Sequence, residues 1–292
     1  MNWVNAVIQG ILLGGFYALL ACGLSLMFGV MRIINLAHGD IAVLGAYLIW
    51  EVAHTLDISP FLALLPVLPV MVAFGYLLQR TILTRALRSG TLVPLLTTFG
   101  IAIIIQNGLL QVYSPDVRSL GSAAGSIATS SWRLTSQLSI PYIGVLTLVV
   151  AIAVLGGLQL VLQRTGFGRE MRATAQDADT ASLVGVPASA VYARATAIAV
   201  GTATIAGLFL ATRSTFDPAS GPTQLIFAFE AVVIGGIGSL WGTLRGGIVL
   251  GIAQTIGANI DPQYAILAGH LVFLAILASP RGRALVSGRG ST

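Results

Sequence analysis

The sequence predicts an all-α protein that crosses a membrane several times. Of its 292 residues, 56% are hydrophobic and only 9% are charged, whereas a soluble domain carries about 25% charged residues. The mean hydropathy is +0.91. Asp, Glu, Lys and Arg are absent from six long windows, and most of these supply the roughly 20 apolar residues that a helix needs to cross the hydrocarbon core. The windows are residues 1–31, 58–79, 89–115, 134–163, 195–212 and 262–280.

These windows and their charged borders predict eight or nine transmembrane helices in a single domain, residues 1–292. The chain begins without the positive n-region of a cleavable signal peptide, so we expect a membrane helix there. Residues 223–260 form either two short spans or one broken or re-entrant helix. Most of the 34 glycines are expected to let the helices pack closely. In chain order the expected spans are 4–29, 34–54, 60–79, 91–112, 141–163, 192–212, 223–240, 245–260 and 263–279.

Arginine predicts the orientation of these spans. All 15 basic residues are arginines, and they gather at the ends of apolar spans. The positive-inside rule places such clusters in the cytoplasm, which accounts for the pI near 9.9 without a nucleic-acid partner. Nine spans with an outward N-terminus satisfy the rule and put the C-terminus in the cytoplasm. The predicted cytoplasmic arginines are Arg32, Arg80, Arg85, Arg88, Arg164, Arg169, Arg172, Arg194, Arg245, Arg281, Arg283 and Arg289.

One cytoplasmic segment is longer than a connection requires. The stretch "RTGFGREMRATAQDADTASLVGVPASAVYAR", residues 164–194, mixes charges of both signs around an Ala-rich centre. Connections between helices usually take about 2–8 residues. We therefore expect a short amphipathic helix at the membrane surface, ended by Gly185 and Pro187. Such a helix would offer a firm contact to a cytoplasmic partner.

A polar cluster interrupts the second predicted span. Asn35 and His38 are three residues apart and share one helix face, whereas Asp40 lies about 200° around from His38. The three side chains cannot line one pore unless the backbone breaks near Gly39. We expect a tight turn or a helix start here, with Asp40 capping the following helix and pairing with Arg32. A structural role and a role in lining a pathway both remain open.

Other polar residues give little sign of catalysis. Glu230 lies near the outer end of a span, where pairing with Arg213 is plausible, and we expect no special role for His270. With one cysteine, Cys22, the chain can form no internal disulfide. No His, Asp and Glu set has the spacing of a metal site or a hydrolase triad. A P-loop needs a lysine for the nucleotide phosphates, and the chain has none. We expect no enzyme and no bound cofactor.

Three blocks resemble one known family, in its order. The stretch "INLAHGDIAVLGAY" is similar to the first signature of the LivH-type permeases, the membrane subunits of branched-chain amino acid ATP-binding cassette (ABC) importers. "GGFYALLACGLSLMFGVMRIINLAHGD" resembles the whole N-terminal region of that family. "RATAQDADTASLVGV" resembles its cytoplasmic coupling loop, and "VVIGGIGSLWGTLRGGIVLG" its C-terminal glycine-rich segment. The resemblance covers nearly the whole chain and implies the ABC importer permease fold.

The resemblance also implies partners. In ABC importer permeases a pattern Glu-Ala-Ala, three residues and Gly enters a groove on the ATPase; Asp179-Thr180-Ala181, three residues and Gly185 match it loosely. It implies a second permease subunit, identical or LivM-like, two cytoplasmic ATPases holding ATP-Mg, an extracytoplasmic binding protein, and the lipid of a bacterial cytoplasmic membrane. The implied coupling residues, within a loop of about 164–191, are Arg169, Glu170, Arg172, Asp179, Ala181 and Gly185.

Two alternatives stay open at this stage. The same machinery could carry urea or short amides, because related permeases serve such cargo. A stand-alone secondary carrier would instead place charged coupling residues near the membrane midplane. The embedded acids of this chain lie toward span ends, which favours the ABC importer.

Overall fold

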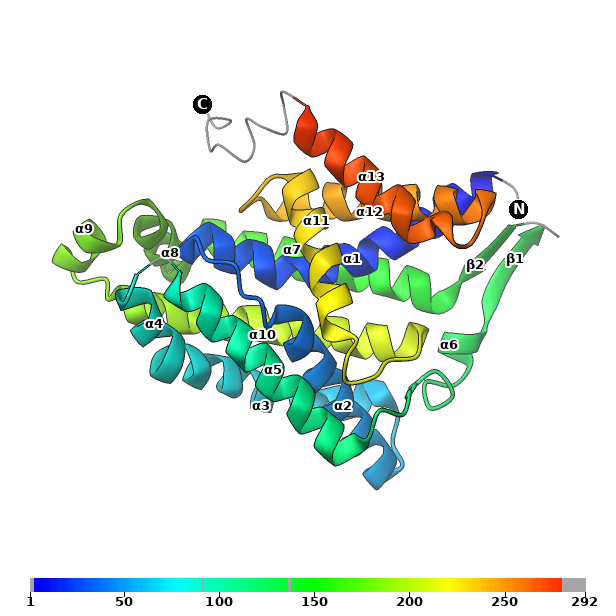
Figure 1. The fold of residues 1–292 in the computed structure, drawn as a ribbon, viewed down its shortest axis with the longest axis horizontal. Coiled ribbons are helices and arrows are strands. Elements are labelled where there is room, and N and C mark those ends of the chain that lie inside the picture. Colours follow the sequence, from blue (N-terminus) through cyan, green and yellow to red (C-terminus); the bar gives the residue numbers. More distant parts are fainter. Residues whose placement is uncertain (1–2, 91, 136–137, 280–292) are drawn as a thin grey trace.

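A computed structural model describes residues 3–90, 92–135 and 138–279, and it is almost entirely helical (Figure 1). Nine longer apolar helices occur in these ranges, one at each predicted span. They are α1 (Trp3–Met31), α2 (His38–Leu56), α3 (Pro60–Leu78), α5 (Val93–Tyr113), α7 (Tyr142–Arg164), α10 (Ala188–Arg213), α11 (Gly221–Gly235), α12 (Leu240–Ile260) and α13 (Tyr264–Ala278).

Shorter elements connect the long helices. The π-helical turn η1 (Gln79–Leu83) and α4 (Thr84–Arg88) extend α3, and α8 (Gly166–Gln176) and α9 (Ala178–Leu183) follow α7. Between α5 and α7 lie α6 (Ser126–Thr129) and an antiparallel hairpin of β1 (Ser131–Thr135) and β2 (Leu138–Pro141).

Five helices of the described chain are long and apolar enough to cross a membrane: α1, the α3–η1–α4 unit, α5, α7 and α10. The pair α11 and α12 forms a sixth candidate, bent by 115° at residues 236–239. This bend corresponds to the broken or re-entrant alternative for residues 223–260. The shorter α13 is also apolar. The chain is therefore a multi-pass helical membrane protein, with a helix count close to the predicted eight or nine.

Helices α1 and α10 form the centre of the molecule. In the apolar window of α10, 89% of the residues are buried, against 22% in α7. In Figure 1, α1, α7 and α10 run along the longest axis. Helices α1 and α12 pack closely, because a Cβ at Gly14 would collide with the backbone of α12 and one at Gly251 with the backbone of α1. Glycine thus serves close packing here, as predicted.

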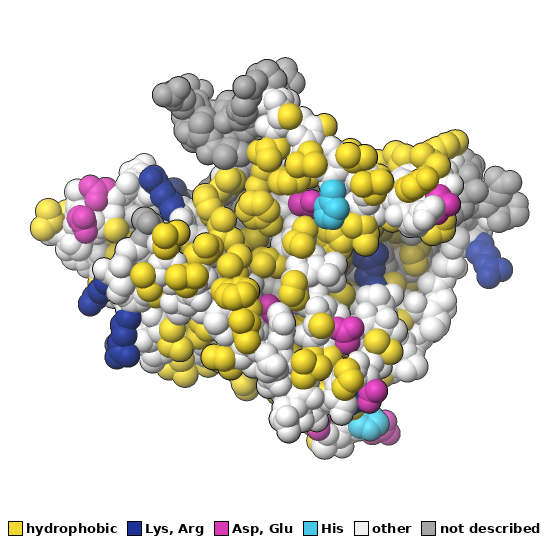
Figure 2. All heavy atoms as spheres, in the orientation of Figure 1, with side chains coloured by type: hydrophobic (Ala, Val, Ile, Leu, Met, Phe, Trp, Pro, Cys, Tyr) yellow, Lys and Arg dark blue, Asp and Glu magenta, His cyan; other side chains and the backbone are white. Residues whose placement is uncertain are grey.

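The outer surface is apolar between two polar ends. Figure 2 shows hydrophobic side chains spread over the visible face. Arginines gather at the end formed by α4, α8 and α9, and the β1–β2 hairpin lies at the opposite end (Figures 1 and 2). A wide apolar surface on a chain of this composition is suited to contact with lipid. The predicted basic tail with Arg281, Arg283 and Arg289 lies outside the described residues.

Candidate functional site

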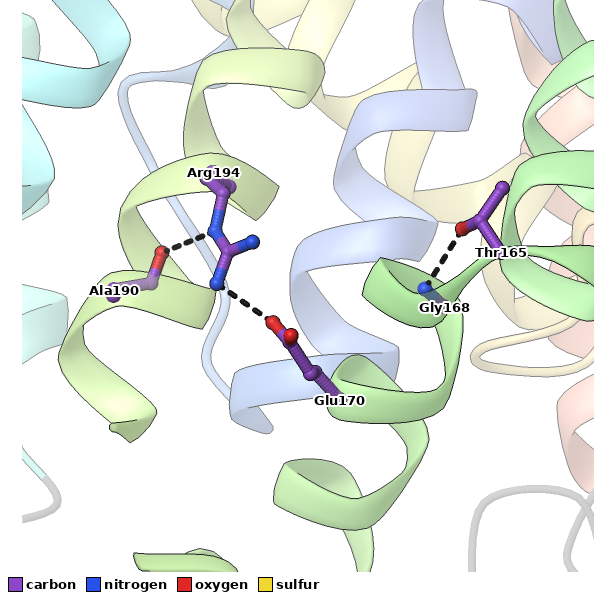
Figure 3. A network of polar contacts seen from close by, with 5 residues as sticks. All are labelled: Thr165, Gly168, Glu170, Ala190 and Arg194. Atoms are coloured by element: carbon purple, nitrogen blue, oxygen red, sulfur yellow. Dashed lines mark hydrogen bonds and ion pairs between the residues drawn. The ribbon is translucent and has the colours of Figure 1, made fainter. Parts of the chain in front are cut away.

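The predicted coupling segment folds as two short helices, not one. The hydroxyl of Thr165 accepts a hydrogen bond from the Gly168 N–H at 3.1 Å and so caps α8 (Figure 3). The chain breaks at Asp177, whose carboxylate accepts from the N–H groups of Asp179 and Thr180 and caps α9. The Thr180 hydroxyl and these N–H groups hold the pKa of Asp177 below its ordinary value. Caps of this kind stabilise a helix by about 1 kcal/mol.

Gly185 ends α9 with a left-handed turn. Its φ is +85°, and its N–H bonds to the Ser182 carbonyl while the Val186 N–H bonds to the Ala181 carbonyl, both at 3.1 Å. This pair of bonds is a Schellman motif, in which glycine is strongly preferred. Beside the buried Ala181, Leu183 and Val184 are 86% and 75% exposed. The turn therefore fixes an apolar tip that projects from the molecule.

An ion pair joins α8 to the first turns of α10. The Arg194 guanidinium donates to the Glu170 carboxylate at 2.7 Å and lies 4.8 Å from the Phe167 ring centroid; its Nε donates to the Ala190 carbonyl (Figure 3). Both charged side chains are partly exposed, so the pair contributes at most about 1 kcal/mol. Its effect is chiefly geometric, because it holds α8 against α10.

The other predicted coupling residues are placed around this connection. The Arg172 guanidinium donates to the Leu162 carbonyl of α7, while Arg169 and Asp179 are exposed. The six predicted residues thus share one segment at the arginine-rich end. Leu183, Val184 and Arg194 belong to the same surface and were absent from the predicted set.

The polar cluster of the second span begins a helix, as expected, but its members diverge. Residues 32–37 are not helical, and α2 starts at His38. His38 Nε2 lies 2.9 Å from the Leu20 carbonyl of α1. The Asn35 side-chain oxygen accepts from the Ala37 N–H at 3.0 Å. His38 and Asn35 therefore bond to different parts of the chain, His38 to α1 and Asn35 to the backbone just ahead of α2.

The expected pairing of Asp40 with Arg32 is wrong. Asp40 is buried in the first turn of α2 and accepts a hydrogen bond from the Gln106 amide of α5 at 2.9 Å. Arg32 is exposed ahead of the helix. The cap position is occupied by Ala37, which has no side-chain cap, so Asp40 does not cap α2 either. The carboxylate faces the protein interior and the guanidinium faces away, which is why the two do not meet.

The suggested pairing of Glu230 with Arg213 is also wrong. The carboxylate of Glu230, on α11, lies 2.5 Å from His270 Nδ1 on α13. His270 is therefore not a lone histidine. Arg213 stacks instead over the Phe16 ring at 5.4 Å. A separation of 40 residues between Glu230 and His270 leaves no local pattern by which the sequence could reveal the pair.

A cavity of about 190 Å³ lies between α1, α10 and α11. Apolar walls from Leu13, Phe16, Phe209 and Phe227 face the polar side chains of Tyr17, Arg213 and Gln224. In the part of the chain that the structure describes, the Arg213 Nη1 and Gln224 Oε1 atoms have no hydrogen-bond partner. A buried polar group without a partner is costly, so this cavity is suited to a small molecule that offers an acceptor to Arg213, a donor to Gln224 and an apolar side.

Sequence reasoning missed several of these residues. Gln106 and Gln224 are amides within apolar stretches, and such residues often face a protein interior in membranes. That signal could have selected them as candidates. It could not have named Asp40 as the partner of Gln106, because the two are 66 residues apart. In the described residues, no group of three or more His, Cys, Asp or Glu could hold a metal ion.

Comparison with known proteins gives a family match and several similar proteins. The family described as "Branched-chain amino acid transport system / permease component" matches residues 6–279. The high-affinity branched-chain amino acid transport system permease protein BraD of Pseudomonas aeruginosa is 30% identical, over 96% of this chain and 95% of that protein. The permease protein LivH of Escherichia coli is 28% identical, over 97% and 95%. Among solved structures, PsaBC from Streptococcus pneumoniae in complex with Fab matches at 15% identity, covering 99% and 96%, with a TM-score of 0.49.

Proposed function

This chain belongs to the branched-chain amino acid transport system / permease component family, and we propose that it is the membrane subunit of an ABC importer for branched-chain amino acids. The similarity to BraD and LivH extends over 95% of each relative. Both relatives are named for branched-chain amino acids, which favours that cargo over urea or short amides. An ABC importer is favoured over a stand-alone carrier because both relatives are named as permease proteins of a transport system.

The remaining parts of the machine are supplied by other chains. We propose a second permease subunit, identical or LivM-like, two ATPases that bind ATP-Mg, and a substrate-binding protein outside the membrane. Without a lysine, this chain cannot form the P-loop that grips nucleotide phosphates. The gathering of arginines around α4 and α8 supports a cytoplasmic position for that end. The arginines of the tail in the sequence, Arg281, Arg283 and Arg289, support the same side for the C-terminus.

The observation that carries the coupling role is the exposed tip of α9. This tip is apolar, and an N-cap and a Schellman turn hold its shape. Such an exposed apolar surface is suited to docking into a groove on another protein. The ion pair between Arg194 and Glu170 connects α8 to α10, so a movement of the α9 tip can be transmitted to α10. In this mechanism, closure of the ATPases shifts α8 and α9, and α7 and α10 carry the shift into the membrane.

The cavity beside Arg213 supplies a place for the cargo. A guanidinium can receive a carboxylate through two parallel hydrogen bonds, and the Phe209 and Phe227 walls can receive an aliphatic side chain. Weak binding is sufficient at such a site, because high affinity can reside in the delivery protein. Alternating access requires that the cargo leave the path as readily as it enters.

Replacement of Leu183 by Asp tests the coupling role. A charge on the apolar tip should abolish co-purification of the ATPases, because a groove that accepts Leu183 would have to bury an unpaired carboxylate. Val117→Asp is the matched control, since Val117 is also exposed, at 65%, outside the long helices. Both variants should insert and remain monodisperse in detergent. Normal ATPase binding and transport by L183D would contradict the proposed coupling.

A further inference from the structure

Two cavities adjoin along the seam between α3 and α10. The larger is an apolar groove of about 680 Å³, to which Val72, Ala73 and Leu77 of α3 and Ala197 and Ile198 of α10 contribute. Ala73 and Leu77 are exposed at the surface, so the groove opens sideways, where lipid surrounds a membrane helix. Its walls offer almost no polar partner to an occupant.

The second cavity, of about 320 Å³, lies where α3 continues into η1 and α4. It is polar and rich in arginine: Arg80, Arg85 and Arg88 line it together with Thr84, and Ser189 contributes from the first turn of α10. In the described part of the chain, none of these three arginines forms an ion pair with an acid. Three unneutralised cations around one cavity favour an anionic occupant.

Tyr76 connects the two cavities because it lines both. Its hydroxyl accepts a hydrogen bond from the Arg80 guanidinium at 3.1 Å. Positions Tyr76, Arg80, Thr84 and Arg88 follow at four-residue spacing, which is the spacing of neighbours on one helix face. The groove and the arginine pocket therefore form one elongated surface site, which is apolar along its length and cationic at one end.

From this juxtaposition we propose that the α3–α10 seam binds one anionic phospholipid of the surrounding membrane. The phosphate lies among Arg80, Arg85 and Arg88, where planar guanidinium groups match phosphate geometry. An acyl chain fills the groove beside Val72 and Ile198. A free phosphate or nucleotide would leave the groove empty, whereas a zwitterionic lipid would leave the arginines without a net anion. Basic pockets between transmembrane helices are known places for anionic head groups.

The site also adjoins the coupling segment. Phe167 and Arg194 line the apolar groove, and these are the residues that hold α8 against α10. A bound acyl chain would pack against Phe167 and leave it less room to move away from α10. The bound lipid would therefore contact the place where α8 packs against the membrane helix α10.

Native mass spectrometry of the purified chain tests the proposal without any partner. The probes are phosphatidylglycerol, phosphatidylcholine with the same acyl chains, and inorganic phosphate. We expect one phosphatidylglycerol to be retained, with phosphatidylcholine and phosphate displacing it poorly. Each of Arg80→Gln, Arg85→Gln and Arg88→Gln should weaken phosphatidylglycerol binding by about fivefold. Arg245→Gln, at an exposed arginine of α12, should leave it unchanged.

A second variant separates lipid binding from phosphate binding. Ala73→Trp fills the groove from an exposed position and should reduce phosphatidylglycerol binding while leaving the weak interaction with inorganic phosphate unchanged. Equal retention of phosphatidylcholine, competition by inorganic phosphate as strong as by lipid, or an equal loss with Arg245→Gln would each overturn the proposal. Because binding is measured on this chain alone, the result does not depend on transport or on the ATPases.

Discussion

Glu230 and His270 show how a single buried contact can organise the end of this fold. The Glu230 side chain is only 4% exposed, and His270 is the one side chain of the described residues that hydrogen-bonds to it. Burial of an unpaired carboxylate costs several kcal/mol. His270 therefore holds α13 to α11 and partners Oε1 of Glu230, whereas Oε2 has no hydrogen-bond partner among the described residues.

Replacement of His270 should show how much the stability of the protein depends on its contact with Glu230. His270→Ala should destabilise the protein by about 1–3 kcal/mol, because it leaves a buried acceptor unsatisfied. In a Glu230→Gln background the same change should cost less, since no charge is left behind. Thermal unfolding in detergent of the wild type, both single variants and the double variant measures this coupling. Additive effects would show that the two side chains do not interact energetically.

At the scale of elements, contacts between helices depend on small residues. Gly39 of α2 lies against the backbone of α11, where a Cβ would overlap the Gly221 carbonyl. A Cβ at Gly221 would in turn collide with the Asp40 carboxylate. The hydrogen bond between Asp40 and Gln106 then ties α2 to α5. Three helices thus meet at one place where only glycine allows the approach.

Gly39→Ala tests this packing. The added methyl would force α2 and α11 apart, and we expect a large loss of folded protein in detergent. Gly100→Ala on α5 is the matched control, because nothing lies within 4 Å of a Cβ there. It should be neutral or stabilising, by up to about 1 kcal/mol, since alanine is the better helix former. The measurement is monodisperse yield by size exclusion; similar yields for both variants would contradict the packing argument.

At the scale of the whole molecule, the cavity at Arg213 and the tip of α9 lie at opposite ends of α10. Arg213 is the last residue of that helix, and Arg194 near its beginning holds α8. One mostly buried helix therefore connects the proposed cargo site with the proposed ATPase contact. A rigid connection of this kind is suited to transmitting a two-state movement.

Arg213→Gln should uncouple transport from ATP use. Loss of a charged hydrogen-bond donor weakens carboxylate binding by about tenfold or more, so we expect leucine uptake to fall about tenfold in proteoliposomes of the full importer. ATP hydrolysis stimulated by the binding protein should persist. Arg133→Gln, at an exposed arginine of β1, is the control. A parallel fall in uptake and hydrolysis would show that Arg213 is structural instead.

The sequence by itself determined the class of this protein and the order of its helices. Uncharged windows of about 20 residues predict membrane helices. In the described residues a long helix lies at each of the nine expected spans, and five or six of these units are long and apolar enough to cross a membrane. The loop of residues 164–191 was predictable for a similar reason, because its length, mixed charge and terminal Gly185 are local properties.

Only the tertiary structure decided which polar groups meet. Asp40 binds Gln106 rather than Arg32, and Glu230 binds His270 rather than Arg213. Each observed partner lies on another helix, and its approach depends on the rotation and separation of packed helices. A hydropathy pattern does not determine the rotation or the separation of packed helices. An apolar stretch specifies that a helix is embedded but not which of its faces contacts which neighbour.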